Sequence, residues 1–323
     1  MSQPAPNPTI ADAGAPFDDP EADIILRSSD NTDFRVFKVI LKLASHVFKD
    51  MLSIPQPSIS FLSHEDTRDG LPVVRVSEDA RALDLMLRWC YPLPSPLQRS
   101  LNHARLALEL SEKYQIDGLS QIGKDCLKAV IKSNALAAYA VACRFDLPDV
   151  AKAAAKATLA RPLSAHPSSE LTSISADRYQ TLVSYHQRCG EVASAVADDR
   201  RWLPVGIMVR APSNPCSMCC SRDARSTVAF TPVSSWASVY LWDFLARAAI
   251  ALRARPDASA IGSLYRVQTF TCPSCGLNRM SSLPAIRQVL AEEVSAAVGR
   301  VTLPNVYGHC ATSPLLLQPC RTF

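Results

Sequence analysis

The order of the hydrophobic patterns between residues 24 and 90 constrains the fold of this chain more than any other feature. Ile24 and Leu26 alternate with Ile25 along one stretch, and apolar residues return near residues 34–36. The turn-forming segment SSDNTD lies between these two stretches, so the pattern predicts a β-hairpin. Over residues 38–52 apolar residues recur at three- and four-residue steps, which predicts one continuous helix. A short strand, VVRVS, and a second helix capped by Ser77 follow. The pattern therefore predicts a short sheet covered by helices.

Beyond this region the pattern becomes helical. Short amphipathic segments with short connectors run from Leu101 to Pro162, which predicts a stacked helical array. A longer helix is predicted from Ala176 to Val196, and Pro, Cys and turn residues dominate from about Arg200 onwards. The last part is predicted to contain two helices and the strand YRVQTF.

These patterns predict an α+β fold class. The first residues are rich in Pro and Ala and lack an apolar period, which is typical of a disordered leader and not of a secretory signal. The predicted domains are a leader at 1–20, an α+β domain at 21–130, a helical extension at 131–200 and a Cys-containing domain at 201–323.

The first of these folded domains resembles the BTB/POZ domain. The resemblance includes ADIILRS, the later VVRVSEDARALDLMLRWCY and the closing helices to about Thr158. It also includes a set of residues at the spacing of the family's first helix: Phe34, Lys38, Leu41, Ser45, Phe48 and Met51. The helices that follow resemble a BACK-like extension, and the layout is similar to BTB proteins of basidiomycete fungi. The resemblance implies a short sheet with a helical shell, and a homodimerising scaffold that can recruit a cullin ubiquitin ligase. Members that bind a cullin often carry an apolar-x-Glu element after the first helix, and LSIPQPSIS contains no Glu.

A sheet with a thin helical shell leaves apolar positions at its edge, and a second copy can bury them in a two-fold contact. The candidates for this dimer interface are Ile24, Leu26, Val39 and Leu43. The alternative for each of them is an ordinary core position.

Two Cys-x-x-Cys pairs, Cys216/Cys219 and Cys272/Cys275, provide a candidate metal site. Two such pairs supply the four thiolates of a tetrahedral structural zinc site. The alternatives are buried thiols that pack as small hydrophobes and a redox dithiol. Further cysteine and histidine residues offer substitute ligands: Cys220, His309, Cys310 and Cys320.

Three functions remain open. The first is a dimeric adaptor of a cullin ligase, and the second is a nuclear or chromatin-associated scaffold. The second is suggested by the C-terminal part, which from Arg201 onwards has twelve Arg, no Lys and five acidic residues. The third is an enzyme that uses Cys189 or another thiol. His186 lies one helical turn from Cys189, so the two could be a base and a nucleophile or a ligand pair, and the alternative is that both pack in the helical array. No phosphate-binding loop or hydrolase motif occurs, so we predict a non-enzymatic interaction protein. We also predict that it has no membrane span and is intracellular, in the cytoplasm or the nucleus. Nucleic acid is the less favoured partner.

Overall fold

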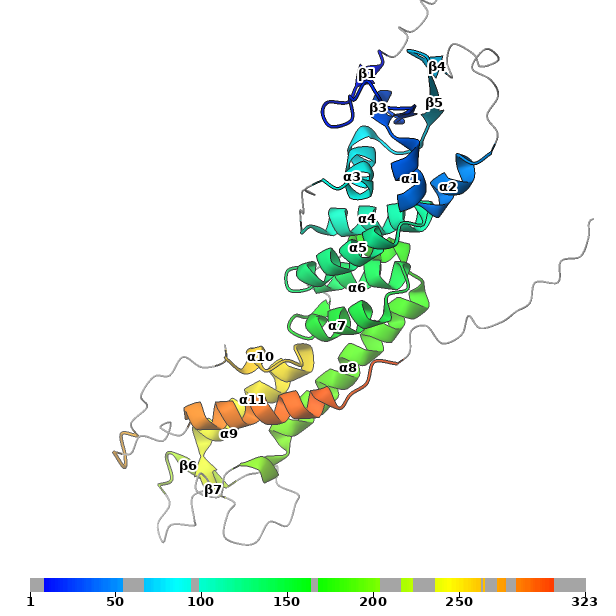
Figure 1. Cartoon of the computed structure of the whole chain (residues 1–323). Coiled ribbons are helices and arrows are strands. Elements are labelled where there is room, and N and C mark those ends of the chain that lie inside the picture. Colours follow the sequence, from blue (N-terminus) through cyan, green and yellow to red (C-terminus); the bar gives the residue numbers. More distant parts are fainter. Residues whose placement is uncertain are drawn as a thin grey trace, which may run out of the picture. The chain divides into compact units, whose positions relative to one another are not determined.

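The computed structural model divides the chain into two compact units, Met1–Val130 and Ile131–Phe323 (Figure 1). The structure describes residues 9–54, 67–93, 99–163, 168–203, 216–222, 236–262, 264, 272–276 and 283–304. The fold class is α+β as predicted, with a small sheet and helices, a helical middle region and a cysteine cluster near the C-terminus.

The sheet of unit 1 has the strand order β1-β3-β2-β5-β4. Its strands are β1 (Ala11–Asp12), β2 (Ile24–Arg27), β3 (Thr32–Val36), β4 (Thr67–Arg68) and β5 (Leu71–Arg75). The predicted hairpin is confirmed, because β2 pairs antiparallel with β3 and Leu26 lies opposite Phe34. Since side chains alternate across a strand, one face of the hairpin carries apolar side chains into the helical core.

The helices of unit 1 are α1 (Lys38–Ala44), α2 (His46–Met51), α3 (Ala80–Cys90), α4 (Leu101–Tyr114) and α5 (Asp117–Val130). The prediction of one helix over residues 38–52 was wrong, because Ser45 has an extended backbone (φ −137°, ψ 127°) and separates α1 from α2. Its hydroxyl oxygen accepts a hydrogen bond from the backbone N–H of Phe48 (3.1 Å) and donates one to the carbonyl oxygen of Tyr114 (2.5 Å). Ser45 therefore caps α2 and also ties it to α4.

The cap of α3 also differs from the prediction. Asp79, and not Ser77, precedes the helix, and its carboxylate accepts a hydrogen bond from the backbone N–H of Ala82 (2.8 Å). The Ser77 hydroxyl instead accepts a hydrogen bond from Lys113 Nζ (2.6 Å). A carboxylate at this position also interacts favourably with the helix dipole.

Unit 2 is built around α8 (Ala176–Asp198). The predicted helical array corresponds to α4 and α5 of unit 1 and, in unit 2, to α6 (Ala135–Arg144) and α7 (Pro148–Thr158), which pack against each other. The other helices are η3 (Ser169–Ser173), η4 (Arg200–Trp202), α9 (Val239–Ala254), α10 (Ser259–Gly262) and α11 (Leu283–Gly299). Both α9 and α11 pack against α8, so a helix that ends at Asp198 packs against helices that lie after residue 200 (Figure 1). The domain boundary near Arg200 stays a prediction.

Unit 2 also contains a two-stranded antiparallel sheet of β6 (Cys220–Arg222) and β7 (Trp236–Ser238). Strand β7 continues directly into α9. The predicted strand at residues 265–270 lies outside the described residues. None of the helices in the described part of the chain is long and apolar enough to cross a membrane.

The contact between α8 and α9 depends on Gly190. A Cβ atom at this position would lie 2.5 Å from the backbone carbonyl oxygen of Arg253. This distance is shorter than the distances that Cβ atoms keep from non-bonded atoms in proteins. We therefore expect Gly190→Ala to destabilise unit 2 by about 1–3 kcal/mol, because α9 must move away from α8. The measurement is urea unfolding followed by circular dichroism.

The matched control is Gly299→Ala at the end of α11, where a Cβ atom would meet nothing within 4 Å. We expect this variant to be as stable as the wild type or slightly more stable, because Ala favours a helix over Gly. Equal stability of the two variants would contradict the close approach of α8 and α9.

Candidate functional site

The four cysteines of the two Cys-x-x-Cys pairs meet in unit 2. The Sγ atoms of Cys216, Cys219, Cys272 and Cys275 all lie within 4.8 Å of one another. The Sγ–Sγ distance is 3.9 Å between Cys216 and Cys272 and 3.6 Å between Cys219 and Cys275. All four cysteines are free, so the cluster is not a pair of disulfides. These side chains can together hold a metal ion.

The same backbone turn presents each pair of thiols. The backbone N–H of Cys220 donates to the carbonyl oxygen of Cys216 (3.0 Å), and that of Gly276 donates to the carbonyl oxygen of Cys272 (2.8 Å). In both pairs the donor is the fourth residue after the first cysteine. Gly276 has φ +68°, a conformation that glycine adopts without strain. The glycine of the CPSCG segment is therefore required by the turn that closes the second pair.

The geometry of the cluster fits a tetrahedral thiolate site. With Zn–S bonds of about 2.3 Å, the sulfur atoms of such a site lie about 3.8 Å apart. Two Sγ–Sγ distances between the pairs, 3.9 and 3.6 Å, lie on either side of this value. Cys219 and Cys272 are buried, whereas Cys216 and Cys275 are half-buried. Four protein ligands fill a tetrahedral site, which is the arrangement of a structural metal.

Backbone groups favour the thiolate form in the first turn. Hydrogen bonds from the backbone N–H groups of Met218 and Cys219 lower the pKa of Cys216 to about 6. N–H groups that donate to a thiolate also support a bound metal, because they orient the sulfur and disperse its charge.

The predicted substitute ligands are only partly placed by the structure. Cys220 is buried in β6, and its Sγ atom lies 3.8 Å from that of Cys219. It is not a member of the four-thiol cluster. His309, Cys310 and Cys320 lie outside the described residues.

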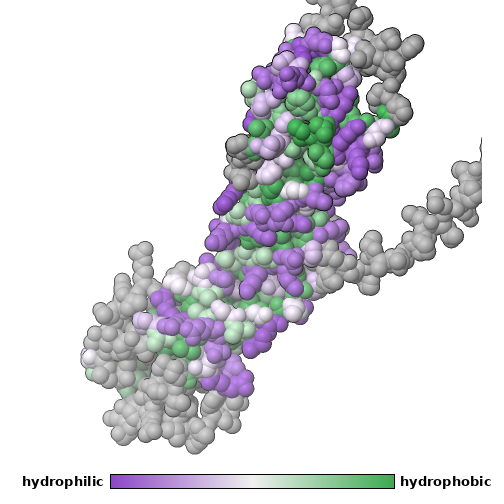
Figure 2. Space-filling view, viewed as in Figure 1, coloured by the Kyte–Doolittle hydropathy of each residue, from purple (hydrophilic) through white to green (hydrophobic). Residues whose placement is uncertain are grey.

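The four residues predicted at a dimer interface are in two different environments. Ile24 and Leu26 are fully buried in the core of unit 1, so their side chains cannot form an exposed edge. For these two residues the burial favours the alternative of an ordinary core position, because the hairpin face that carries them is covered by the unit's own helices. Val39 and Leu43 on α1 are exposed by 60% and 83%. Figure 2 shows apolar side chains gathered on the surface of this unit around α1.

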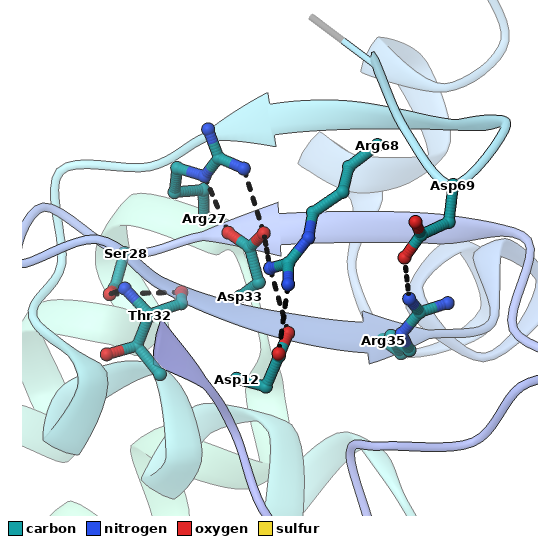
Figure 3. Close-up of polar contacts among 8 residues, drawn as sticks. All are labelled: Asp12, Arg27, Ser28, Thr32, Asp33, Arg35, Arg68 and Asp69. Atoms are coloured by element: carbon teal, nitrogen blue, oxygen red, sulfur yellow. Dashed lines mark hydrogen bonds and ion pairs between the residues drawn. The ribbon is translucent and has the colours of Figure 1, made fainter. Parts of the chain in front are cut away.

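The opposite face of the hairpin carries a buried network of charges that the sequence analysis did not predict. Arg27 Nε and Nη2 donate to the two carboxylate oxygens of Asp33 at 2.6 and 2.8 Å, and Asp33 is only 1% exposed. Arg68 of β4 donates to Asp33 (2.6 Å) and also to Asp12 of β1 (2.9 Å). Figure 3 shows the Arg68 guanidinium between these two carboxylates. The network therefore links four strands through one buried carboxylate.

A signal for half of this network was present in the sequence. Arg27 and Asp33 are cross-strand partners in the register of the hairpin, so the hairpin pattern alone brings them together. Arg68 is 35 residues further along the chain than Asp33, and no local pattern connects the two.

The thiol-enzyme hypothesis finds no support at Cys189. This cysteine is buried in α8, and burial raises the pKa of its thiol. Burial lowers the pKa of His186, whose Nε2 atom lies 3.2 Å from the carbonyl oxygen of Arg161. A catalytic thiol needs a lowered pKa and access to substrate, and the surroundings of Cys189 provide neither.

Comparison with known proteins identifies the first unit. Residues 18–131 match the family model of the BTB/POZ domain. No curated protein matches the chain. The chain therefore contains a BTB/POZ domain, which is a module of protein–protein interaction and not of catalysis, and this finding supports the role of a protein-interaction scaffold.

Proposed function

We propose, from the premise that residues 18–131 form a BTB/POZ domain, that this protein is a homodimerising scaffold that presents unit 2 to a partner. The observation that carries the proposal is the exposed pair Val39 and Leu43. They lie four residues apart on α1, so their side chains are neighbours on one helical face. A second copy can cover this face in a self-complementary contact.

The finer parts of the proposal concern unit 2. The proposed BACK-like extension covers residues 131–200 and is supported by the paired helices α6 and α7. The proposed resident metal is one structural Zn²⁺, held by Cys216, Cys219, Cys272 and Cys275. Such an ion would join two short turns that otherwise have little core of their own. We also propose that the protein is of the type found among BTB proteins of basidiomycete fungi.

The first candidate partner is a cullin scaffold, for which the protein would act as a substrate adaptor. The support for this candidate is the BTB/POZ domain itself. The test is a pull-down with the full chain as bait and a purified cullin N-terminal domain as prey. Binding at micromolar affinity or better would establish the adaptor, and no binding would leave a scaffold without a ligase.

The second candidate is a nuclear or chromatin-associated scaffold. It is favoured by the excess of Arg over acidic residues after residue 200. This candidate requires nucleic-acid binding whose affinity falls steeply as salt is added. A gel-shift series at increasing salt concentration distinguishes it from the cullin adaptor.

Dimerisation has its own expected result. Replacing both Val39 and Leu43 with Asp should convert the dimer to a monomer, because the contact would bury four carboxylates without partners. The measurement is light scattering coupled to size-exclusion chromatography.

The matched control for this experiment is Ile250→Asp, which places a charge at an exposed apolar position of α9 (73% exposed). This variant should remain a dimer. A monomeric wild type, or a double variant that remains dimeric, would contradict the proposed α1 contact.

A further inference from the structure

A groove between α3 and α4 of unit 1 has a volume of about 540 Å³. One wall is formed by the start of α3 with Arg81 and Leu85, and the other by α4 with His103, Arg105 and Leu106. The groove contains both signs of charge, since four acidic residues also line it. The state of each charge therefore decides what the groove can bind.

The acidic residues of the groove already have partners within the protein. Glu78 accepts hydrogen bonds from Lys113 and from the Tyr114 hydroxyl. Asp79 caps α3, and Asp84 pairs with Arg88 at 2.8 Å. The fourth acidic residue, Glu109, also has an interaction in the chain. These carboxylates are not available to a ligand without loss of an existing contact.

Lys113, one cation of the groove, is paired with Glu78, but the two arginines of the groove are in the opposite state. Among the residues that the structure describes, neither Arg81 nor Arg105 has a carboxylate partner. The Nε atom of Arg105 and the Nε2 atom of His103 are both buried without a hydrogen-bond partner in the described chain. Buried polar atoms are nearly always satisfied in proteins, and a guanidinium Nε–H can only donate, so the exception at Arg105 marks a place where an acceptor is missing.

The chemistry of the missing acceptor follows from the donors. A guanidinium offers a planar set of N–H groups that matches a carboxylate, often in two parallel hydrogen bonds. The lining of the groove also has apolar side chains, and two of them, Leu85 and Leu110, are buried. This combination suits a carboxylate next to an aliphatic side chain.

We propose that the groove between α3 and α4 binds a partner protein through a segment in which Asp or Glu lies beside an aliphatic residue. Arg81 and Arg105 receive the carboxylate, and the leucines of the lining receive the aliphatic side chain. The inference rests on the proposed scaffold function, since it defines the chemistry of a partner. It does not involve Val39 or Leu43, so peptide binding and dimerisation can fail independently.

The test begins with selection of a random 12-residue peptide display library on the full-length protein. The selected peptides should be enriched in Asp or Glu next to aliphatic residues. The affinity of the most enriched peptide is then measured by fluorescence anisotropy. The double variant Arg81→Gln/Arg105→Gln should bind about ten-fold more weakly or worse, because two charge-assisted contacts are lost.

The matched control is Arg188→Gln, which removes the same charge from an exposed position of α8 and should change the affinity less than about two-fold. Arg81→Gln alone, at an exposed position, keeps the test decisive if the double variant does not fold. We expect about three-fold weaker binding for it. Three outcomes would overturn the proposal. The selected peptides could show no enrichment in Asp or Glu, or Arg188→Gln could lower the peptide affinity as much as the double variant does. The third is that the protein binds nucleic acid and no acidic peptide.

Discussion

Replacing Cys272 with Ser is expected to abolish metal binding and to unfold the part of unit 2 that surrounds the cysteine cluster. The wild type should hold one Zn²⁺ per chain, because four thiols converge at distances that suit a tetrahedral site. A Ser hydroxyl is a poor zinc ligand, and three thiolates leave the site open to solvent and competing chelators. In small zinc domains the binding energy of the ion is folding energy, about 10 kcal/mol or more.

The physical reason for a large effect is the separation of the two pairs in sequence. Fifty-two residues lie between Cys219 and Cys272. Among the described residues, the contacts at the cluster come from the short β6–β7 sheet, the two turns and the start of α9, where Tyr240 packs against the cysteines. Without the ion, the thiolates of the two pairs would repel each other instead of sharing one cation.

The measurements are elemental analysis of the purified full-length protein and limited proteolysis with and without a chelator. Cys220→Ser is the matched control, because Cys220 is buried next to Cys219 but does not belong to the cluster. This variant should keep one zinc ion per chain. Substoichiometric zinc in the wild type, unchanged by Cys272→Ser, would rule the metal site out.

Replacing Asp33 with Asn should destabilise unit 1 by about 3–5 kcal/mol, because it removes the carboxylate that Arg27 and Arg68 share. The amide has nearly the same shape, so the loss reports charge and hydrogen bonding, not packing. The effect should appear as a lower midpoint in urea unfolding, with an unchanged slope if the unfolded state is the same. The control is Asp69→Asn, which removes the partner of Arg35 at a side chain that is 60% exposed. We expect that variant to lose less than about 1 kcal/mol.

The contribution of Asp33 to the free energy of unfolding should also depend on pH and should decrease under acid conditions. Burial opposes ionisation of Asp33, but the hydrogen bonds from Arg27 and Arg68 outweigh it and hold the pKa below its ordinary value of 3.8. A lowered pKa in the folded state stabilises the protein above pH 3.8, and this contribution is lost as the pH falls through the folded-state pKa. The stability difference between wild type and Asp33→Asn should therefore be constant at neutral pH and shrink under acid conditions. A difference that does not change with pH would contradict the assignment.

The limits of sequence reasoning are clearest at the first helix. The periodicity of apolar residues over 38–52 continues through Ser45, although Ser is a residue type that can cap a helix. In the structure the Ser45 hydroxyl caps α2 locally and also binds the carbonyl oxygen of Tyr114, which is 69 residues away and which no local pattern connects to it. Ile24 and Leu26 illustrate the same limit, because an alternating pattern identifies an apolar face but not what covers it.

Local spacing alone determined the hairpin, the helical array and the two Cys-x-x-Cys pairs, because strand alternation, helix periodicity and short metal-binding turns are properties of neighbouring residues. Tertiary structure decided everything that joins distant segments. It brought the two cysteine pairs together, left Val39 and Leu43 exposed while burying Ile24 and Leu26, and placed Arg68 on Asp33. The groove between α3 and α4 also depends on tertiary structure. The packing of these two helices decides which of its carboxylates are paired and leaves its arginines without carboxylate partners among the described residues. The physical reason is that burial and charge pairing depend on what is near in space, and a sequence pattern reports only what is near along the chain.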